Sequence, residues 1–323
     1  ACLKGLTAGT RSLLDKGADV NAQGGHFGNA LQAASYEGHQ DIVQMLLDKG
    51  ADVNAQGGHF GNALQAASYG GHQEIVQTLL DKGADVNAQG GDYGNALQAA
   101  SNGGRQDIVQ TLLNKGADVN AQGGWYGNAL QAASYGGHQD IVQTLLDKGA
   151  DFNAQGGDYG NALRAASLRG HQDIVQTLLD KGADINAQGG DFGNALQAAS
   201  YGGRQDIVQM LLDKGADVNA QGGHFSNALQ AASYGGHQDI IQMLLDKGAD
   251  VNAQGGHFGN ALQAASSKGH TEIVQTLLDK GADVNAQGGW YGNALQAASS
   301  NGHTEVVSLL LNMKTIALDY KSS

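Results

Sequence analysis

A short block of sequence returns along this chain at a fixed interval of 33 residues. The tetrapeptide Gly-Asn-Ala-Leu begins at Gly28, Gly61, Gly94, Gly127, Gly160, Gly193, Gly259 and Gly292, and a variant copy, Ser-Asn-Ala-Leu, begins at Ser226. A chain of 323 residues would ordinarily suggest about two globular domains. A fixed period of this size, without insertions or deletions, instead indicates a solenoid in which each repeat packs on its neighbours.

Each repeat has the pattern of two short helices, as residues 24–56 illustrate. Small, helix-favouring residues over Ala30–Tyr36 predict the first helix, and Gln40–Lys49 predicts a second helix that ends at Gly50 in a left-handed cap. The apolar residues of the second helix fall on one face: Ile42, Val43, Leu46 and Leu47. Helices this short are unstable alone, so neighbouring repeats must cover that face. The sequence therefore predicts an all-α solenoid of helix-turn-helix units joined by hairpin-like loops.

The composition excludes several classes of protein. The formal charge of −13 opposes a nucleic-acid backbone or an anionic membrane as the main partner. Cys2 is the only cysteine, so the chain has neither a disulfide framework nor a cysteine-based zinc cluster. No apolar run approaches the roughly 18 residues of a membrane span, and no signal-peptide pattern opens the sequence. We therefore expect a cytoplasmic protein.

The polar residues do not indicate an enzyme, because nearly all of them recur once per repeat instead of forming one unique group. Histidine occupies such a column: His39, His72, His138, His171, His237, His270 and His303, with Arg105 and Arg204 in the two gaps. Packed helices lie about 8–10 Å apart, so we expect equivalent residues of adjacent repeats to be too far apart to share a metal ion. We expect these side chains to form structural hydrogen bonds at the start of the second helix. No catalytic residue, metal or cofactor is expected.

Three further repeated features have structural interpretations. Asp52 and Asn54, with their copies, are expected to be turn residues that bond the local backbone. Glycine pairs such as Gly57-Gly58 are expected to be turn glycines, because no phosphate-binding motif accompanies them. A third feature, an aromatic column, is expected to pack each loop against the next one: Phe27, Phe60, Tyr93, Tyr126, Tyr159, Phe192, Phe225, Phe258 and Tyr291.

The repeat resembles the ankyrin repeat, whose length is also 33 residues. In residues 24–56 the resemblance is carried by Gly28, Leu31, Ala34, Gly38, His39, Ile42, Val43, Leu46, Leu47 and the segment Gly-Ala-Asp-Val-Asn at 50–54. The main departure is Ala30, which replaces the proline that begins the first helix in the family. The longer pattern Gly-Gly-x-aromatic-Gly-Asn-Ala-Leu-Gln-Ala-Ala-Ser is similar to the ankyrin arrays of fungal NOD-like (NACHT/ankyrin) receptors, in which the array follows a nucleotide-binding domain.

We interpret residues 1–323 as a single ankyrin-repeat domain. Residues 1–23 match only the second half of a repeat, with Thr10 in the place of Val43, and predict a partial N-terminal unit. Residues 24–291 are expected to form stacked repeats. Residues 292–323 are expected to hold the last helix pair and a C-terminal cap.

Positions that vary between such similar repeats are candidates for binding, because the fold does not dictate them. The loop-tip column varies from acid to indole: His26, His59, Asp92, Trp125, Asp158, Asp191, His224, His257 and Trp290. Exposed tryptophan is enriched at contact hot spots. In the ankyrin family the loop tips and the first-helix surface form a concave binding face, so the resemblance implies that these positions contact a partner.

A second variable column lies at the end of the first helix, where tyrosine is frequent and provides rigid anchors for a partner. The candidate contacts in this column are Tyr36, Tyr69, Tyr135, Leu168, Tyr201 and Tyr234. The repeat that contains Leu168 also carries Arg164 and Arg169, which predict a basic spot in an acidic molecule.

These observations favour a protein-interaction module that binds a protein or peptide, with no small-molecule substrate evident. The resemblance to fungal receptors implies the ligand-sensing part of an innate-immunity receptor. An alternative stays open, in which the chain is a passive scaffold or spacer, or an engineered consensus array without a specific ligand.

Overall fold

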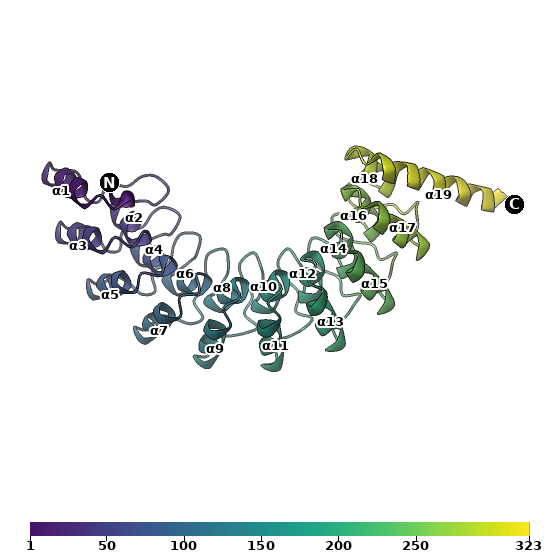
Figure 1. The fold of residues 1–323 in the computed structure, drawn as a ribbon. Coiled ribbons are helices and arrows are strands. Elements are labelled where there is room, and N and C mark those ends of the chain that lie inside the picture. The colour runs from purple at the N-terminus through teal and green to yellow at the C-terminus, as the bar shows by residue number, and fades with distance from the viewer. Residues whose placement is uncertain (323) are drawn as a thin grey trace. The chain divides into compact units, whose positions relative to one another are not determined.

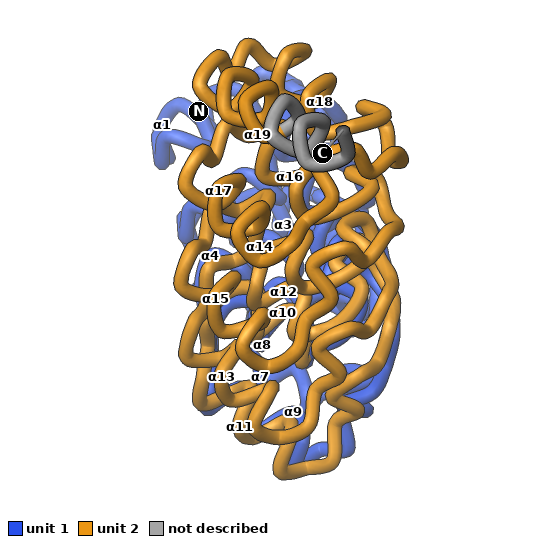
Figure 2. The backbone as a smooth tube through the Cα atoms, turned by 90° about the vertical axis from the view of Figure 1, so that its right-hand side faces the viewer, with its two compact units in different colours: residues 1–162 blue, residues 163–323 orange. Residues whose placement is uncertain are grey.

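The chain is represented by a computed structural model that describes residues 1–322, with side chains described as far as residue 313. Pairs of short helices follow one another along the chain, with a loop between successive pairs (Figure 1). The backbone divides into two compact units, Ala1–Ala162 and the part of the chain from Leu163 onward (Figure 2). Both units consist of the same repeats, so the predicted all-α solenoid of helix-turn-helix units is confirmed.

The helices of the first unit alternate between second and first helices of a repeat. They are η1 (Cys2–Lys4), α1 (Thr7–Asp15), α2 (Ala30–Tyr36), α3 (Gln40–Asp48), α4 (Ala63–Gly70), α5 (Gln73–Asp81), α6 (Ala96–Asn102), α7 (Gln106–Asn114), α8 (Ala129–Gly136) and α9 (Gln139–Asp147). In this unit the even-numbered helices are first helices and the odd-numbered ones are second helices.

The second unit continues the alternation. Its helices are α10 (Ala162–Arg169), α11 (Gln172–Asp180), α12 (Ala195–Tyr201), α13 (Gln205–Asp213), α14 (Ala228–Gly235), α15 (Gln238–Asp246), α16 (Ala261–Lys268), α17 (Thr271–Asp279), α18 (Ala294–Ser300) and α19 (Thr304–Ser322). Among the described residues of the whole chain, extended backbone pairs only as isolated β-bridges within the loops.

At α2, α4, α6, α8, α12, α14, α16 and α18 an asparagine side chain caps the helix, and at α2, α4, α8 and α12 it forms a full capping box. The Asn29 side chain accepts a hydrogen bond from the Gln32 N–H at 2.9 Å, and the Gln32 side chain accepts one from the Asn29 N–H at 3.1 Å. In the repeat that this sequence resembles, a proline begins the first helix. Here the reciprocal cap stabilises that helix start instead. The remaining positions are mostly alanine, and their small side chains let successive first helices pack closely. Ala66 and Ala67 of α4, for example, are fully buried.

The second helices bury the apolar face that the sequence predicts. Ile42, Val43 and Leu46 of α3 are buried, whereas Leu47 is only partly buried. The predicted cap at Gly50 is confirmed. Its φ is +85°, its N–H donates to the Leu47 carbonyl, and the next N–H donates back to Leu46, which is the Schellman arrangement.

The two ends of the chain differ from the inner repeats. At the N-terminus, α1 occupies the place of a second helix, and Thr10 is buried where Val43 stands in the following repeat, as predicted. At the other end α19 continues as one helix from Thr304 to Ser322. The side chains of residues 314–323, which the sequence assigns to a C-terminal cap, lie outside the described part of the chain, and the single-domain organisation stays a prediction.

Candidate protein-binding surface

The loop tips of successive repeats are joined directly by backbone hydrogen bonds. Each loop is a small hairpin closed by a glycine pair, in which the Gly57 N–H donates to the Gly61 carbonyl at 2.8 Å. Gly58 has a φ of +64°, and a Cβ there would collide with the backbone of Phe27, so the predicted turn role of this glycine is confirmed. One bond per repeat then links the tips.

We call the row of linked tip residues in each unit its tip ridge. In the first unit the ridge is His26, His59, Asp92, Trp125 and Asp158, and each residue's N–H donates to the carbonyl of the one before it at 2.8–2.9 Å. In the second unit the ridge is Asp191, His224, His257 and Trp290, with the same bonds at 2.7–3.0 Å.

Side chains on the tip ridge lie much closer together than the helix spacing suggests. The rings of His26 and His59 stack with centroids 4.9 Å apart, and those of His224 and His257 stack at 4.3 Å. The expectation that equivalent residues of adjacent repeats lie about 8–10 Å apart is therefore wrong at the tips. The reason is that helices are separated by their side chains, whereas the tips are separated by one backbone hydrogen bond.

Most of the tip side chains face solvent. Trp125 is 53% exposed and Trp290 is 77% exposed, which makes them the most exposed aromatic residues of the described chain. In the second unit the ring of Trp290 lies 4.8 Å from that of His257 and extends the histidine stack. Partial burial, reinforced by His257, lowers the pKa of His224 below its ordinary value.

The aromatic column of the loops is a packing device, as predicted. Phe27, Phe60 and Tyr93 stack in sequence, with ring centroids 6.2 Å and 5.7 Å apart. The tyrosines at the ends of the first helices interleave with them. The ring of Tyr36 lies 5.4 Å from Phe27 and 4.8 Å from Phe60, and so bridges two repeats.

This interleaving changes what the tyrosine column offers to a partner. The candidate residues Tyr36, Tyr69, Tyr135, Tyr201 and Tyr234 are all partly buried. Burial and the neighbouring Tyr69 hydroxyl raise the pKa of Tyr93 well above its ordinary value, and burial and Tyr135 raise that of Tyr159 in the same way. The tyrosines therefore pack against the aromatic residues of the loops and are only partly exposed to solvent.

The comparisons with known proteins agree with this architecture. The family described as ankyrin repeats (3 copies) matches residues 57–123, 97–189, 130–222, 164–255, 196–288 and 229–322, and ankyrin repeats (many copies) match residues 31–79. The chain belongs to the ankyrin repeat family. Ankyrin repeats are generic protein–protein interaction modules and are typically not enzymes. A search of the curated proteins found no match.

The histidine column of these ankyrin repeats has the structural role predicted for it. His72 Nε2 lies 2.8 Å from the Tyr36 carbonyl of the preceding repeat, and His138, His237, His270 and His303 make the same contact at 2.9–3.2 Å. Arg105 and Arg204 replace the imidazole with Nε, which donates to the equivalent carbonyl at 3.1 and 3.0 Å. The described residues include no group of three side chains suited to a metal ion.

Two columns of amide side chains fasten one ankyrin repeat to the next, and the sequence analysis missed both functions. We call them the inter-repeat amides. Gln65 donates to the Ala88 carbonyl at the end of its own repeat at 3.2 Å and to the Gly94 carbonyl of the following repeat at 3.0 Å. Asn54 donates to the Gly83 carbonyl at 3.1 Å and accepts from the Asp85 N–H at 2.8 Å.

The expectation for Asp52 and Asn54 is therefore half right. Asp52 bonds the local backbone through the Asn54 N–H at 2.9 Å, but the Asn54 side chain bonds the following repeat and not its own turn. For the glutamines, the spacing Asn-x-x-Gln before a helical stretch was the available signal, because it is a capping-box pattern.

Arg164 is not part of an exposed basic spot, which corrects the sequence interpretation. It occupies the column of Gln65 and is 1% exposed. Its Nη1 donates to the Gly193 carbonyl at 2.6 Å, as a glutamine of that column does, and burial lowers its pKa to about 10. Arg169 is exposed, and Leu168 is partly buried, with its carbonyl accepting from Arg204.

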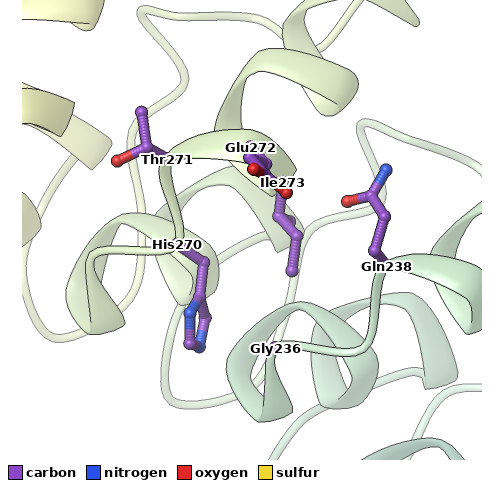
Figure 3. Close-up of a pocket in the computed structure, with 6 residues that line it drawn as sticks. All are labelled: Gly236, Gln238, His270, Thr271, Glu272 and Ile273. Atoms are coloured by element: carbon purple, nitrogen blue, oxygen red, sulfur yellow. The ribbon is translucent and has the colours of Figure 1, made fainter.

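Shallow pockets lie at the junctions between second helices. A shallow pocket of about 240 Å³ lies between the starts of α15 and α17, lined by Gly236, Gln238, His270, Thr271, Glu272 and Ile273 (Figure 3). Pockets of the same kind recur at equivalent junctions of the second unit, so they belong to the repeat and not to one specialised place. No described helix is long and apolar enough to cross a membrane.

Proposed function

We propose that the tip ridges, together with the exposed edges of the first helices, bind a protein or peptide. The observation that carries this proposal is that two exposed tryptophans, Trp125 and Trp290, each lie on the hydrogen-bonded tip ridge of their own unit. The fold does not require a large apolar side chain there, since His and Asp occupy the same column. Rigid aromatic side chains are frequent anchors of protein interfaces.

The surface includes the tip residues named above, with Tyr36, Tyr69, Tyr135, Leu168, Arg169, Tyr201 and Tyr234 beside them. The buried Arg164 is left out of it. The proposed activity is binding without catalysis, in the cytoplasm.

A narrower form of the proposal makes this array the ligand-sensing part of a fungal innate-immunity receptor. Its support is the repeated pattern Gly-Gly-x-aromatic-Gly-Asn-Ala-Leu-Gln-Ala-Ala-Ser, which is similar to the arrays of NACHT/ankyrin receptors. The near-identity of the repeats favours the competing function, a passive scaffold or spacer, or an engineered array, because neither of those needs a distinct site.

A selection from a random peptide library on the immobilised chain tests the proposal. We expect enriched peptides that lose binding when Trp125, Asp158 and Trp290 are all replaced by alanine. A control variant carries Asp140→Ala, on an exposed part of the second helix α9, and should bind as the wild type does. Circular dichroism checks that helicity is unchanged. Peptides that bind the wild type and the triple variant equally, or a selection without enrichment, would favour the scaffold.

A further inference from the structure

Trp125 is an exposed ring held in a defined place on the first tip ridge. Its N–H donates to the Asp92 carbonyl, and its own carbonyl accepts from the Asp158 N–H, both at 2.8 Å. The indole meets the ring of His59 edge to face, with centroids 6.1 Å apart. About half of its surface is nevertheless in contact with solvent. The backbone is fixed on both sides, so a ligand that stacks on this ring pays little ordering cost in the receptor.

The neighbours of Trp125 on the ridge are both acidic. Asp92 is held by His59, whose Nδ1 lies 2.5 Å from the carboxylate. Asp158 is exposed, and it forms no ion pair with any residue for which the structure gives a side chain. The ridge contains no lysine or arginine, and the chain as a whole carries a formal charge of −13. An exposed indole whose two neighbours on the ridge are both acidic complements a cation that is also planar.

We propose that Trp125, Asp158 and Asp92 capture an arginine side chain from a basic segment of a protein partner. The guanidinium stacks on the indole and donates hydrogen bonds to the Asp158 carboxylate, with Asp92 adding to the negative potential. Lysine fits less well, because its compact ammonium does not stack and is more strongly hydrated. This inference rests on the proposed function and names the chemistry of its partner.

The second tip ridge provides an internal control. Trp290 is more exposed than Trp125, but its neighbour on the ridge is His257, and the only carboxylate of that ridge, Asp191, is three positions away. If exposure of an indole were enough, Trp290 would be the better arginine site. If the carboxylates decide, only Trp125 binds, and a carboxylate placed at His257 should create a second site.

Titration calorimetry on the full chain tests this with two peptides, alternating Arg-Gly and alternating Gln-Gly. We expect Arg-Gly to bind one site and Gln-Gly not to bind. Trp125→Ala should weaken Arg-Gly binding about fivefold to tenfold. Asp158→Asn should weaken it about threefold.

Two further variants separate local contact from net charge. Asp279→Asn removes the same charge as Asp158→Asn from an exposed position at the end of α17, and should leave the affinity unchanged. His257→Asp should raise the stoichiometry from one site to two. Equal weakening by Asp158→Asn and Asp279→Asn, or unchanged binding by Trp125→Ala, would overturn the inference. Library peptides that need the tips but contain no arginine would overturn it too, while leaving the proposed function intact.

Discussion

The inter-repeat amides and the tip ridges occur once per repeat in the same molecule, yet they behave in opposite ways. Gln65 is fully buried and holds three backbone groups, so its column tolerates only Arg164 as a substitute. The bond that joins every tip to the next is a backbone bond, so His, Asp and Trp alternate there. The comparison teaches that a position in a repeat can vary when the hydrogen bond that joins it to the next repeat does not involve its side chain.

The largest effect should come from removing an inter-repeat amide. Gln65→Ala leaves the Ala88 carbonyl and the Asn62 N–H without partners and removes one of the two hydrogen bonds to the Gly94 carbonyl, and should lower the free energy of unfolding by about 3 kcal/mol. Urea unfolding followed by circular dichroism measures this. Gln296→Ala is the matched control, because Gln296 occupies the same column but is exposed at the last repeat, and should cost well under about 1 kcal/mol. Equal losses of unfolding free energy in the two variants would contradict the stabilising role of the buried inter-repeat amides.

A smaller effect, this time a gain in stability, should come from the loop in which Ser226 occupies a backbone conformation that favours glycine. Ser226 has a φ of +68°, where the other repeats have glycine, and it is the only described residue other than glycine with a positive φ. Ser226→Gly should raise the free energy of unfolding by about 1 kcal/mol because it removes this strain. A lower melting temperature for the variant would contradict it.

A pH effect should appear in the second tip ridge. Folding lowers the pKa of His224 from its ordinary value of 6.5. As the pH falls below 6.5, the unfolded chain therefore binds more protons at this residue than the folded chain does. The stability contributed by neutral His224 is therefore present above that pH and is lost as the pH falls below it. We expect unfolding at pH 7.5, 6.5 and 5.5 to show a shallower decline for His224→Phe, which keeps an aromatic ring there. Parallel declines would show that His224 is not responsible.

The smallest effect on stability should come from the most exposed tip. Trp290→Ala should change the free energy of unfolding by less than about 0.5 kcal/mol, since 77% of that side chain already faces water. Differential scanning fluorimetry is sufficient to measure it. A loss comparable to that of Gln65→Ala would mean that the tips help to hold the junctions through their side chains.

The sequence predicted the parts of the fold that depend on local pattern. The spacing of Ile42, Val43 and Leu46 predicts the buried face of α3, and Gly50 predicts where that helix ends. The structure confirms both predictions. The distances between equivalent residues of adjacent repeats could not be predicted in the loops, because helix spacing does not determine the distance between loop tips. Arg164 was misplaced because an arginine in an acidic molecule suggests a surface position, whereas its column is buried at the inner repeats, where the side chain bonds backbone carbonyls.

The regularity of the inter-repeat amides has a consequence for how such a gene changes. The bonds of Gln32 and Asn21 reach carbonyls 23 and 29 residues ahead, and Asn21 accepts from an N–H 31 residues ahead. Bonds of the same kind at the same offsets recur along the chain, so most junctions accept most repeats. Recombination that deletes, duplicates or reorders whole 33-codon blocks therefore leaves the junctions bonded and changes the order of the variable residues, those at the tips among them.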